Sequence, residues 1–233
     1  MTIFVLPSPD QVVLPQPVSS FGSEGEGPGQ FNNPAGITTD QKGNIYICDG
    51  RNHRIQKFDK DGVPLLQFGK EGAGPGEFKG LFGIVMDPWR GRIIISDNGN
   101  HRLQFFTLEG EFLFQVGREG QGEGEFYNLT GLAISPGGEE IAVTDRFNHR
   151  VQILDAEKGG FLRQIGKEGE GEGELKYPNG ICYFSNGDLA VSERGNKRIQ
   201  VRTSLFRFSS VTLMVASSLR WRGHRTELFM IGI

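Results

Sequence analysis

Three histidines, His53, His101 and His149, each stand between an asparagine and an arginine, with an aspartate four residues before the histidine. Imidazole and carboxylate groups ligate metal ions and transfer protons, and arginine binds phosphate and carboxylate groups. A fourth copy, at residues 193–200, has glutamate for the aspartate and lysine for the histidine. The copies therefore indicate either one binding site used four times or one structural unit built four times.

The spacing of the copies favours a structural repeat. The asparagines stand at positions 52, 100, 148 and 196, one every 48 residues. Before each of them comes a connector rich in glycine and glutamate. The connectors begin at Phe21, Phe68, Val116 and Ile165.

Four short apolar runs, separated by turns of Gly, Asn and Asp, make up the first unit. The runs are at 36–40, 45–49, 54–59 and 64–69. Runs of this length between such turns predict β-strands joined as hairpins, and no stretch has the periodicity of an amphipathic helix. Four strands in a repeat of about 48 residues predict one blade of a β-propeller.

The repeated pattern P-x-G-I-x-x-D-x-x-G-N-I-Y-I-x-D-x-x-N-H-R-I-Q-x-F-D-x-x-G resembles the NHL repeat. The connectors, F-G-x-x-G-x-G-x-G-x-F, are similar to those in the propellers that end tripartite-motif (TRIM-NHL) proteins. The resemblance covers residues 21–201 and implies an all-β propeller of NHL type with four four-stranded blades. Because NHL propellers usually have six blades, we expect an incomplete, open part of a six-bladed ring.

This interpretation divides the chain into three parts. Residues 1–20 form an N-terminal segment whose end fits the outer strand of a preceding blade, and residues 202–233 form a divergent tail without the repeat pattern. We expect this tail to come from a different segment of the gene rather than to complete the last blade. The four repeats between them are 21–67, 68–115, 116–164 and 165–201.

The structural interpretation of the corner assigns each residue type a local role. In the first copy, Asp49 ends a strand and accepts backbone N–H groups, and Asn52 tolerates left-handed backbone geometry. Arg54 leans outward and pairs with the acid or with a neighbouring blade. Because strand direction alternates in a four-stranded blade, corners and connectors are expected on the same face of the propeller.

The functional interpretation makes the basic corner residues a ring for RNA or for an acidic protein. The connectors oppose this ring with eleven glutamates on the same face, which lower the positive potential that nucleic acids require. The candidate binding residues are Arg51, Arg54, Arg102, Arg146, Arg150, Arg194, Lys197 and Arg198.

Other chemistry finds little support in the sequence. The corner histidines fall in successive blades and do not converge as metal ligands do, so we expect no metal and no cofactor. Neither a calcium loop nor a phosphate-binding loop pattern occurs. Phe82, Trp89, Phe147 and Tyr177 depart from the repeat, and exposed aromatic residues on one face would mark a binding site.

Composition restricts the location and the partners. The chain has 233 residues, a net charge of −3 and two cysteines, Cys48 and Cys182. Two cysteines are too few for a disulfide framework and favour a reducing compartment, so we expect a cytoplasmic protein. The sequence lacks a secretory leader pattern and an apolar run long enough to span a bilayer, so no membrane partner is expected.

Three hypotheses about function follow. The first is a non-catalytic module that presents one face to a protein partner, as the target-selecting part of a TRIM-NHL-type ubiquitin ligase. Ligase activity would need a longer parent protein with RING zinc motifs. RNA binding through the arginine corners is the alternative. A metal-dependent lyase-type propeller and a bacterial sensor propeller are weaker, because the inner strands lack histidine and the leader is absent. Open blade edges would also favour self-association.

Overall fold

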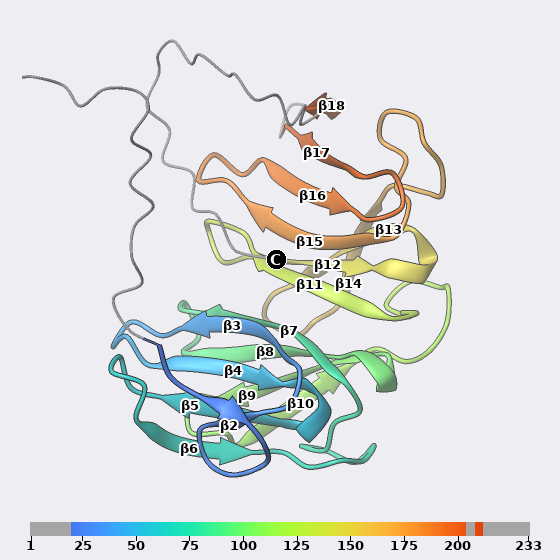
Figure 1. The fold of residues 1–233 in the computed structure, drawn as a ribbon. Coiled ribbons are helices and arrows are strands. Elements are labelled where there is room, and N and C mark those ends of the chain that lie inside the picture. Colours follow the sequence, from blue (N-terminus) through green and yellow to red (C-terminus); the bar gives the residue numbers. More distant parts are fainter. Residues whose placement is uncertain (1–19, 204–207, 212–233) are drawn as a thin grey trace, which may run out of the picture.

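The computed structural model describes residues 20–203 and 208–211, which form an all-β fold. Four four-stranded antiparallel sheets follow one another in chain order, from blue to orange in Figure 1, as the blades of a propeller. Each sheet is a meander in which strands consecutive in sequence are neighbours. The prediction of an all-β propeller with four four-stranded blades is confirmed.

The strands agree closely with the predicted apolar runs. The first blade consists of β3 (Pro34–Thr39), β4 (Ile45–Asp49), β5 (Arg54–Phe58) and β6 (Pro64–Phe68). The second consists of β7 (Leu81–Asp87), β8 (Arg92–Asp97), β9 (Arg102–Thr107) and β10 (Phe112–Val116). The third consists of β11 (Leu129–Ile134), β12 (Glu140–Asp145), β13 (Arg150–Asp155) and β14 (Phe161–Ile165). The fourth consists of β15 (Pro178–Tyr183), β16 (Leu189–Glu193), β17 (Arg198–Arg202) and β18 (Phe208–Val211).

The last blade ends differently from the sequence expectation. Its sequence shows no recognisable fourth strand, yet β18 pairs antiparallel with β17 and fills that place. This strand comes from the segment that we assigned to the divergent tail. Most of the tail and nearly all of the N-terminal segment lie outside the described residues. None of the described residues belongs to a helix long and apolar enough to cross a membrane.

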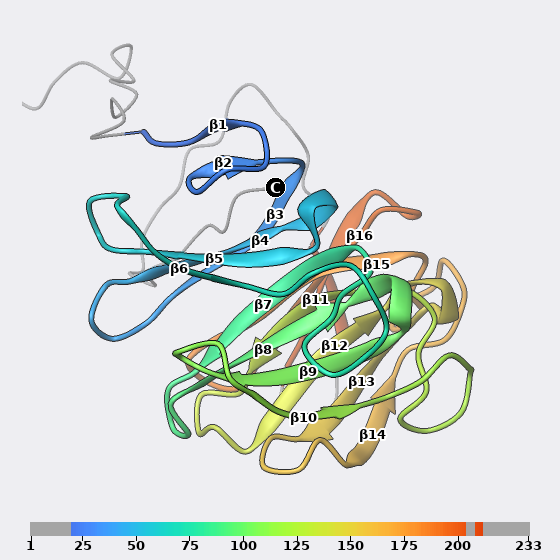
Figure 2. The same cartoon turned by 90° about the horizontal axis from the view of Figure 1, so that it is seen from below.

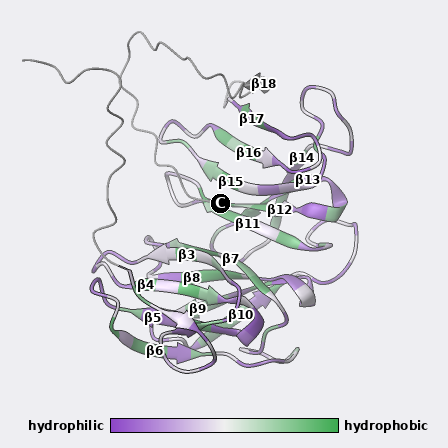
Figure 3. Cartoon of the chain, in the orientation of Figure 1, coloured by the Kyte–Doolittle hydropathy of each residue, from purple (hydrophilic) through white to green (hydrophobic). Residues whose placement is uncertain are grey.

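The hydrophobic core lies between the blades. One cluster joins the first and second blades, a second joins the second and third, and a third joins the third and fourth. Phe78, Phe126 and Leu175, at equivalent positions of the connectors, are buried in these clusters. Figure 3 shows the hydrophobic residues mainly along the strands. The apolar alternation of each strand therefore serves contacts with two neighbouring blades.

The innermost strands approach so closely that one position must be glycine. Each of the four has a bulge in its pairing, and a glycine lies within it. A Cβ atom at Gly83 would lie 2.3 Å from the carbonyl oxygen of Thr130 in the next blade. The hydroxyl of Ser96 bridges the two strands at this point, because it accepts from the Gly83 N–H and donates to the Thr130 carbonyl. Backbone contact between inner strands thus sets the spacing of the blades.

The four blades form an arc over the described residues. β3 packs on β7, β7 on β11 and β11 on β15, but no such packing joins β15 to β3. Ile37 of β3 is 55% exposed. The equivalent Ile84 of β7 and Ile181 of β15 pack into the cores against their preceding blades. Among residues 20–203 and 208–211, none therefore packs on Ile37 as the preceding blade does on Ile84, and this part of the first blade's face is exposed near the propeller axis.

A short parallel pair covers the outer part of that face. β1 (Ser23–Glu24) pairs with β2 (Gln30–Phe31) within the first connector. Figure 2 shows both on the side of the first blade away from β7. Their Phe31 packs on Phe58, with ring centroids 5.7 Å apart. The later connectors have the same parallel pairing as single bridges, such as Glu71 with Phe78.

The corners and the connectors lie on the same side of the propeller, to the right in Figure 1, as strand alternation predicted. Three corners are single 3₁₀ turns: η1 (Gly50–Asn52), η2 (Asn98–Asn100) and η3 (Arg146–Asn148). The expectation that the corner asparagines adopt left-handed geometry is wrong. That geometry belongs to the following residue, with φ between 52° and 55° at His53, His101, His149 and Lys197. The asparagine side chains are instead needed as hydrogen-bond donors.

Candidate interaction face

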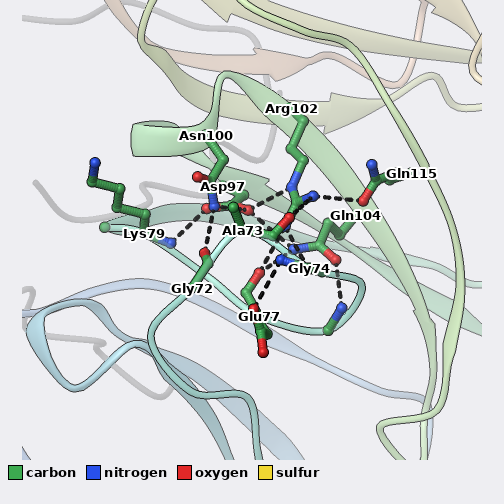
Figure 4. A network of polar contacts seen from close by, with 12 residues as sticks. Gly72, Ala73, Gly74, Glu77, Lys79, Asp97, Asn100, Arg102, Gln104 and Gln115 are labelled. Carbon is green, nitrogen blue, oxygen red and sulfur yellow. Dashed lines mark hydrogen bonds and ion pairs between the residues drawn. The ribbon is translucent and has the colours of Figure 1, made fainter.

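A buried carboxylate organises each corner, and the second blade shows the arrangement (Figure 4). Asp97 is fully buried at the end of β8. Its Oδ1 accepts the backbone N–H of Lys79 at 2.8 Å. Its Oδ2 accepts from Asn100 Nδ2 at 2.9 Å and from Arg102 Nε at 2.8 Å. Gln104 Nε2 also donates to Oδ2, at 3.0 Å. One carboxylate thus gathers the donors that fix both the corner and the connector.

The arginine of the corner holds the connector loop. Arg102 is buried, and its guanidinium donates to the backbone carbonyls of Ala73, Gly74 and Glu77 and to Gln115 Oε1, in addition to Asp97. An arginine has five N–H donors, and all five are used here. A loop rich in glycine presents many backbone carbonyls and few side chains, so a planar fork of donors suits it.

A neighbouring glutamine completes this clamp on the connector. Gln104 accepts the N–H of Gly76 at 2.9 Å and donates to the carbonyl of Glu77 at 2.7 Å. The Glu77 side chain closes the loop from within, because its carboxylate accepts the Gly74 N–H at 2.9 Å. That hydrogen bond, followed by one from Lys70, lowers the pKa of Glu77 below the usual glutamate range. Some connector glutamates therefore cap their own loop and are not simply solvated.

The other three blades repeat the clamp. In each, the corner acid accepts from an asparagine, an arginine and a glutamine, and the arginine donates to connector carbonyls. The arginines are Arg54, Arg150 and Arg198.

This geometry corrects part of the basic-ring hypothesis. The four clamp arginines do not lean outward as predicted, and their N–H groups are donated within the blade. Arg54, Arg102, Arg150 and Arg198 therefore do not form an accessible ring, and their side chains are placed for the structural role that the sequence also suggested.

The histidine of the corner connects one blade to the next. His53 Nδ1 accepts the backbone N–H of Gly80, at 3.2 Å. His101 does the same for Asn128, and His149 for Tyr177, both at 3.2 Å. Each residue that donates its N–H ends the connector that enters the following blade. The residues of the repeated triplet thus have different roles. The asparagine and arginine bind the connector of their own blade, and the histidine binds the connector of the following blade.

The remaining four predicted residues lie on the outside of the corner face. Arg51, Arg194 and Lys197 are exposed and Arg146 is half-buried. Within the described residues, these four side chains form no ion pair with a carboxylate. Their part in binding stays a prediction. They are the members of the predicted set whose charge is available to a ligand.

Three exposed aromatic side chains lie near Arg146 on this face and form what we call the aromatic cluster: Tyr127, Phe147 and Tyr177. Their exposed fractions are 43%, 42% and 37%. The Tyr127 and Phe147 ring centroids are 5.4 Å apart, and those of Phe147 and Tyr177 are 6.0 Å apart. The guanidinium of Arg146 lies 5.4 Å from the Phe147 ring. The backbone N–H of Phe147 donates to the Tyr127 carbonyl, and that of Tyr177 donates to His149 Nδ1, so the third corner holds the three residues together.

The aromatic cluster consists of departures from the repeat. Where Phe147 stands, the other corners have Arg51, Gly99 and Gly195. Where Tyr177 stands, the other connectors have Asn33, Gly80 and Asn128. Where Tyr127 stands, they have Asn32, Lys79 and Lys176. Residues that serve the repeat recur at every copy, so a local group of exceptions indicates a role other than folding.

Backbone strain supports this interpretation at Tyr177. Its φ is 51°, in the left-handed region, as are those of the three equivalent residues. Asparagine and glycine accept this geometry readily, whereas a bulky aromatic residue adopts it at a cost of roughly 1–2 kcal/mol. Strained residues of this kind concentrate at functional sites. Sequence comparison among the four copies could have found Tyr127 too, which single-position reasoning missed.

Comparison with known proteins agrees with this architecture. A model described as the NHL repeat matches residues 31–58 and 175–201, and one described as a 6-bladed beta-propeller matches residues 86–151. Protein lin-41 of Caenorhabditis elegans is 43% identical over 53 residues, and E3 ubiquitin-protein ligase TRIM71 of Rattus norvegicus is 48% identical over 46. These stretches cover 23% and 20% of this chain and about 5% of either relative.

A solved structure extends the likeness over more of the chain. Virginiamycin B lyase from Staphylococcus aureus superposes with a TM-score of 0.59 over 78% of this chain and 56% of the lyase, at 18% identity. Such low identity concerns the fold alone. The fold and the corner geometry define the chain as a β-propeller. Stretches of its first and fourth blades match the NHL-repeat model, and short parts of its sequence are similar to lin-41 and TRIM71.

Proposed function

We propose that this propeller is a non-catalytic interaction module that presents its corner face to a protein partner. The aromatic cluster carries the proposal: three exposed rings, grouped where the repeat is broken, provide the apolar anchor sites on which protein interfaces depend. The similarity to TRIM71, whose name describes a ubiquitin ligase, supports a target-selecting role within a longer parent protein.

Reversion of the aromatic cluster to the residues of the other copies tests the proposal. Tyr127→Lys, Phe147→Gly and Tyr177→Asn each install a residue that the same position has elsewhere in this chain, so the blades keep sequences known to fit them. The combined variant should fold like the wild type, by circular dichroism and thermal unfolding. It should lose the partner that the wild-type propeller enriches in proximity labelling. Equal labelling by both proteins would refute the role of this face.

RNA is the second candidate ligand, favoured by one observation. The exposed cations Arg51, Arg194 and Lys197 share the corner face with the aromatic rings, and nucleic-acid sites combine such charges with stacking surfaces. Crosslinking of RNA to the wild type and to an Arg51→Glu, Arg194→Glu, Lys197→Glu variant tests this. Recovery of the same RNA by the two proteins would exclude the cations as its ligands.

Self-association remains a further proposal, based on the uncovered apolar face of the first blade. Ile37 is exposed, whereas the equivalent Ile84 is buried and Ile181 is half-buried, and uncovered blade edges can pair with other chains. Sedimentation should show concentration-dependent oligomers that Ile37→Asp dissolves. A monomer of unchanged mass across the concentration range would argue against it.

A further inference from the structure

Two cations of the corners that border the aromatic cluster are also departures from the repeat. Arg146 and Arg194 occupy the first position of the corners in the third and fourth blades, where the first two blades have Gly50 and Asn98. The backbone N–H of Arg146 donates to Asn128, next to Tyr127, and that of Arg194 donates to Tyr177. The two arginines therefore lie on the same part of the face as the three rings.

The charge of these arginines is not compensated within the described chain. Neither guanidinium makes an ion pair there, in contrast to Arg118 and Arg163, which pair with Glu125 and Glu140. Nε of Arg146 is buried and has no hydrogen-bond partner among the described residues. A buried donor without an acceptor is unfavourable, and a ligand oxygen that reached it would relieve that deficit.

The surroundings favour a short anionic segment over a long one. Oε1 of Glu170 lies 2.9 Å from Nζ of Lys176, and Oε1 of Glu168 lies 3.7 Å from Nε2 of His149. These carboxylates border the aromatic cluster on the connector that enters the fourth blade. A nucleic-acid strand bears a charge at every phosphate and would be repelled as it crossed them. A peptide with one or two carboxylates needs only the two arginines.

We infer that the segment bound at this site is an acidic peptide, with an apolar side chain seated on the aromatic cluster and carboxylates paired with Arg146 and Arg194. The inference deepens the proposed function and depends on it. Arginine suits this task because its fork binds a carboxylate through two parallel hydrogen bonds. The ring planes of Phe147 and Tyr177 are at 89° to each other, and the two exposed rings offer an apolar surface to the anchor side chain.

Fluorescence anisotropy with matched peptides tests the inference. The probes are a short labelled peptide of aspartate and glutamate with a central leucine, the same peptide with asparagine and glutamine for the acids, and a form with glycine for leucine. A U-rich RNA oligonucleotide is the competing probe. The first peptide should bind, and each change to it should weaken binding about tenfold or more.

Charge reversals locate the binding. Arg146→Glu and Arg194→Glu should each weaken the acidic peptide about tenfold. Arg51→Glu makes the same change on the same face, away from the aromatic cluster, and should have little effect. If all three variants weaken peptide binding equally, the peptide is attracted by the general positive potential of the face and not by a specific site, and the inference is wrong.

The remaining outcomes separate this inference from the proposed function. If the uncharged peptide binds as well as the acidic one and the reversion variant loses both, the proposed function holds and the acidic partner is wrong. If the RNA binds and no peptide does, the acidic peptide is again wrong. If peptide binding survives reversion of the aromatic cluster, the face itself is not the site and both proposals fail.

Discussion

His149 Nδ1 accepts the backbone N–H of Tyr177 at 3.2 Å, and the two rings lie 4.5 Å apart. His149, which joins the third blade to the fourth, thus also packs against a ring of the aromatic cluster. The hydrogen bond depends on the Tyr177 backbone, whereas the cluster depends on its side chain. Structure and binding can therefore be separated by mutation at a single position.

Tyr177→Asn should remove the aromatic contact without weakening the fold. Asparagine relieves the left-handed strain, worth about 1–2 kcal/mol, and the lost ring contacts are worth about 0.5–1.5 kcal/mol. The free energy of unfolding should then stay within about 1 kcal/mol of the wild type, while partner binding falls. Urea denaturation measures the first quantity. Tyr177→Ala is the matched control, which loses the contact but keeps the strain and should be less stable than Tyr177→Asn.

His101→Asn should destabilise the contact between the second and third blades. Asparagine accepts the φ of 55° at this position but cannot reach the Asn128 N–H as the imidazole does. The stack of His101 on Tyr127, with centroids 5.3 Å apart, is lost as well. We expect a loss of about 1–2 kcal/mol in the free energy of unfolding.

Lys197→Asn is the control for the histidine variant. Lys197 has the same left-handed geometry, with φ 52°, in the fourth copy. Its replacement should leave stability unchanged or slightly raised, because asparagine suits that backbone better. A similar loss in both variants would show that the histidine hydrogen bond contributes nothing to joining the blades.

Arg102→Met should be among the most destabilising single changes in the propeller. It leaves the Asp97 carboxylate buried and frees the connector carbonyls of the second blade, and removal of one partner of a buried ion pair costs about 3–5 kcal/mol. Arg146→Met removes an arginine that makes no ion pair with the described residues of the same face, and it should change stability by less than about 0.5 kcal/mol. Thermal unfolding distinguishes the two, and similar melting temperatures would contradict the clamp.

The blades could be predicted from the sequence, but only part of the candidate site could. The constant spacing of Asn52 and its equivalents predicted the strands because a repeat must bury its apolar face against its neighbours. The clamp of Arg102 on Ala73 and Gly74 was hidden, since a backbone carbonyl accepts hydrogen bonds whatever its side chain. The aromatic cluster was found only in part: the sequence marked Phe147 and Tyr177 as departures from the repeat but not Tyr127, and the rings come together only when the third and fourth blades pack.

Acid should weaken the third blade through Glu140. Its carboxylate binds Arg163 by two hydrogen bonds, of 2.6 and 2.8 Å, across the strands β12 and β14. The hydrogen bond from Arg163 lowers the pKa of Glu140 below that of the unfolded chain. The pair therefore stabilises the fold at pH values above the ordinary pKa of glutamate, which is about 4. This contribution is lost as the pH falls through the lower pKa of the folded state.

Glu140→Gln should accordingly lower the melting temperature at neutral pH, and the difference from the wild type should shrink at an acidic pH below the ordinary glutamate range. Arg163→Gln removes the other half of the pair and should lose the same acid-dependent part. A difference from the wild type that stays constant between the two pH values would exclude Glu140 as its source.

Gly83→Ala tests the close approach that sets the blade spacing. The added methyl group would lie 2.3 Å from the Thr130 carbonyl oxygen, which is backbone and cannot turn aside. The inner strands must separate, which disturbs the Ser96 hydrogen bonds and the core between the second and third blades, and we expect a loss of about 3 kcal/mol. Gly160→Ala is the control, because a Cβ there meets nothing within 4 Å. If both variants unfold at the same urea concentration, backbone contact between inner strands does not determine how the blades pack.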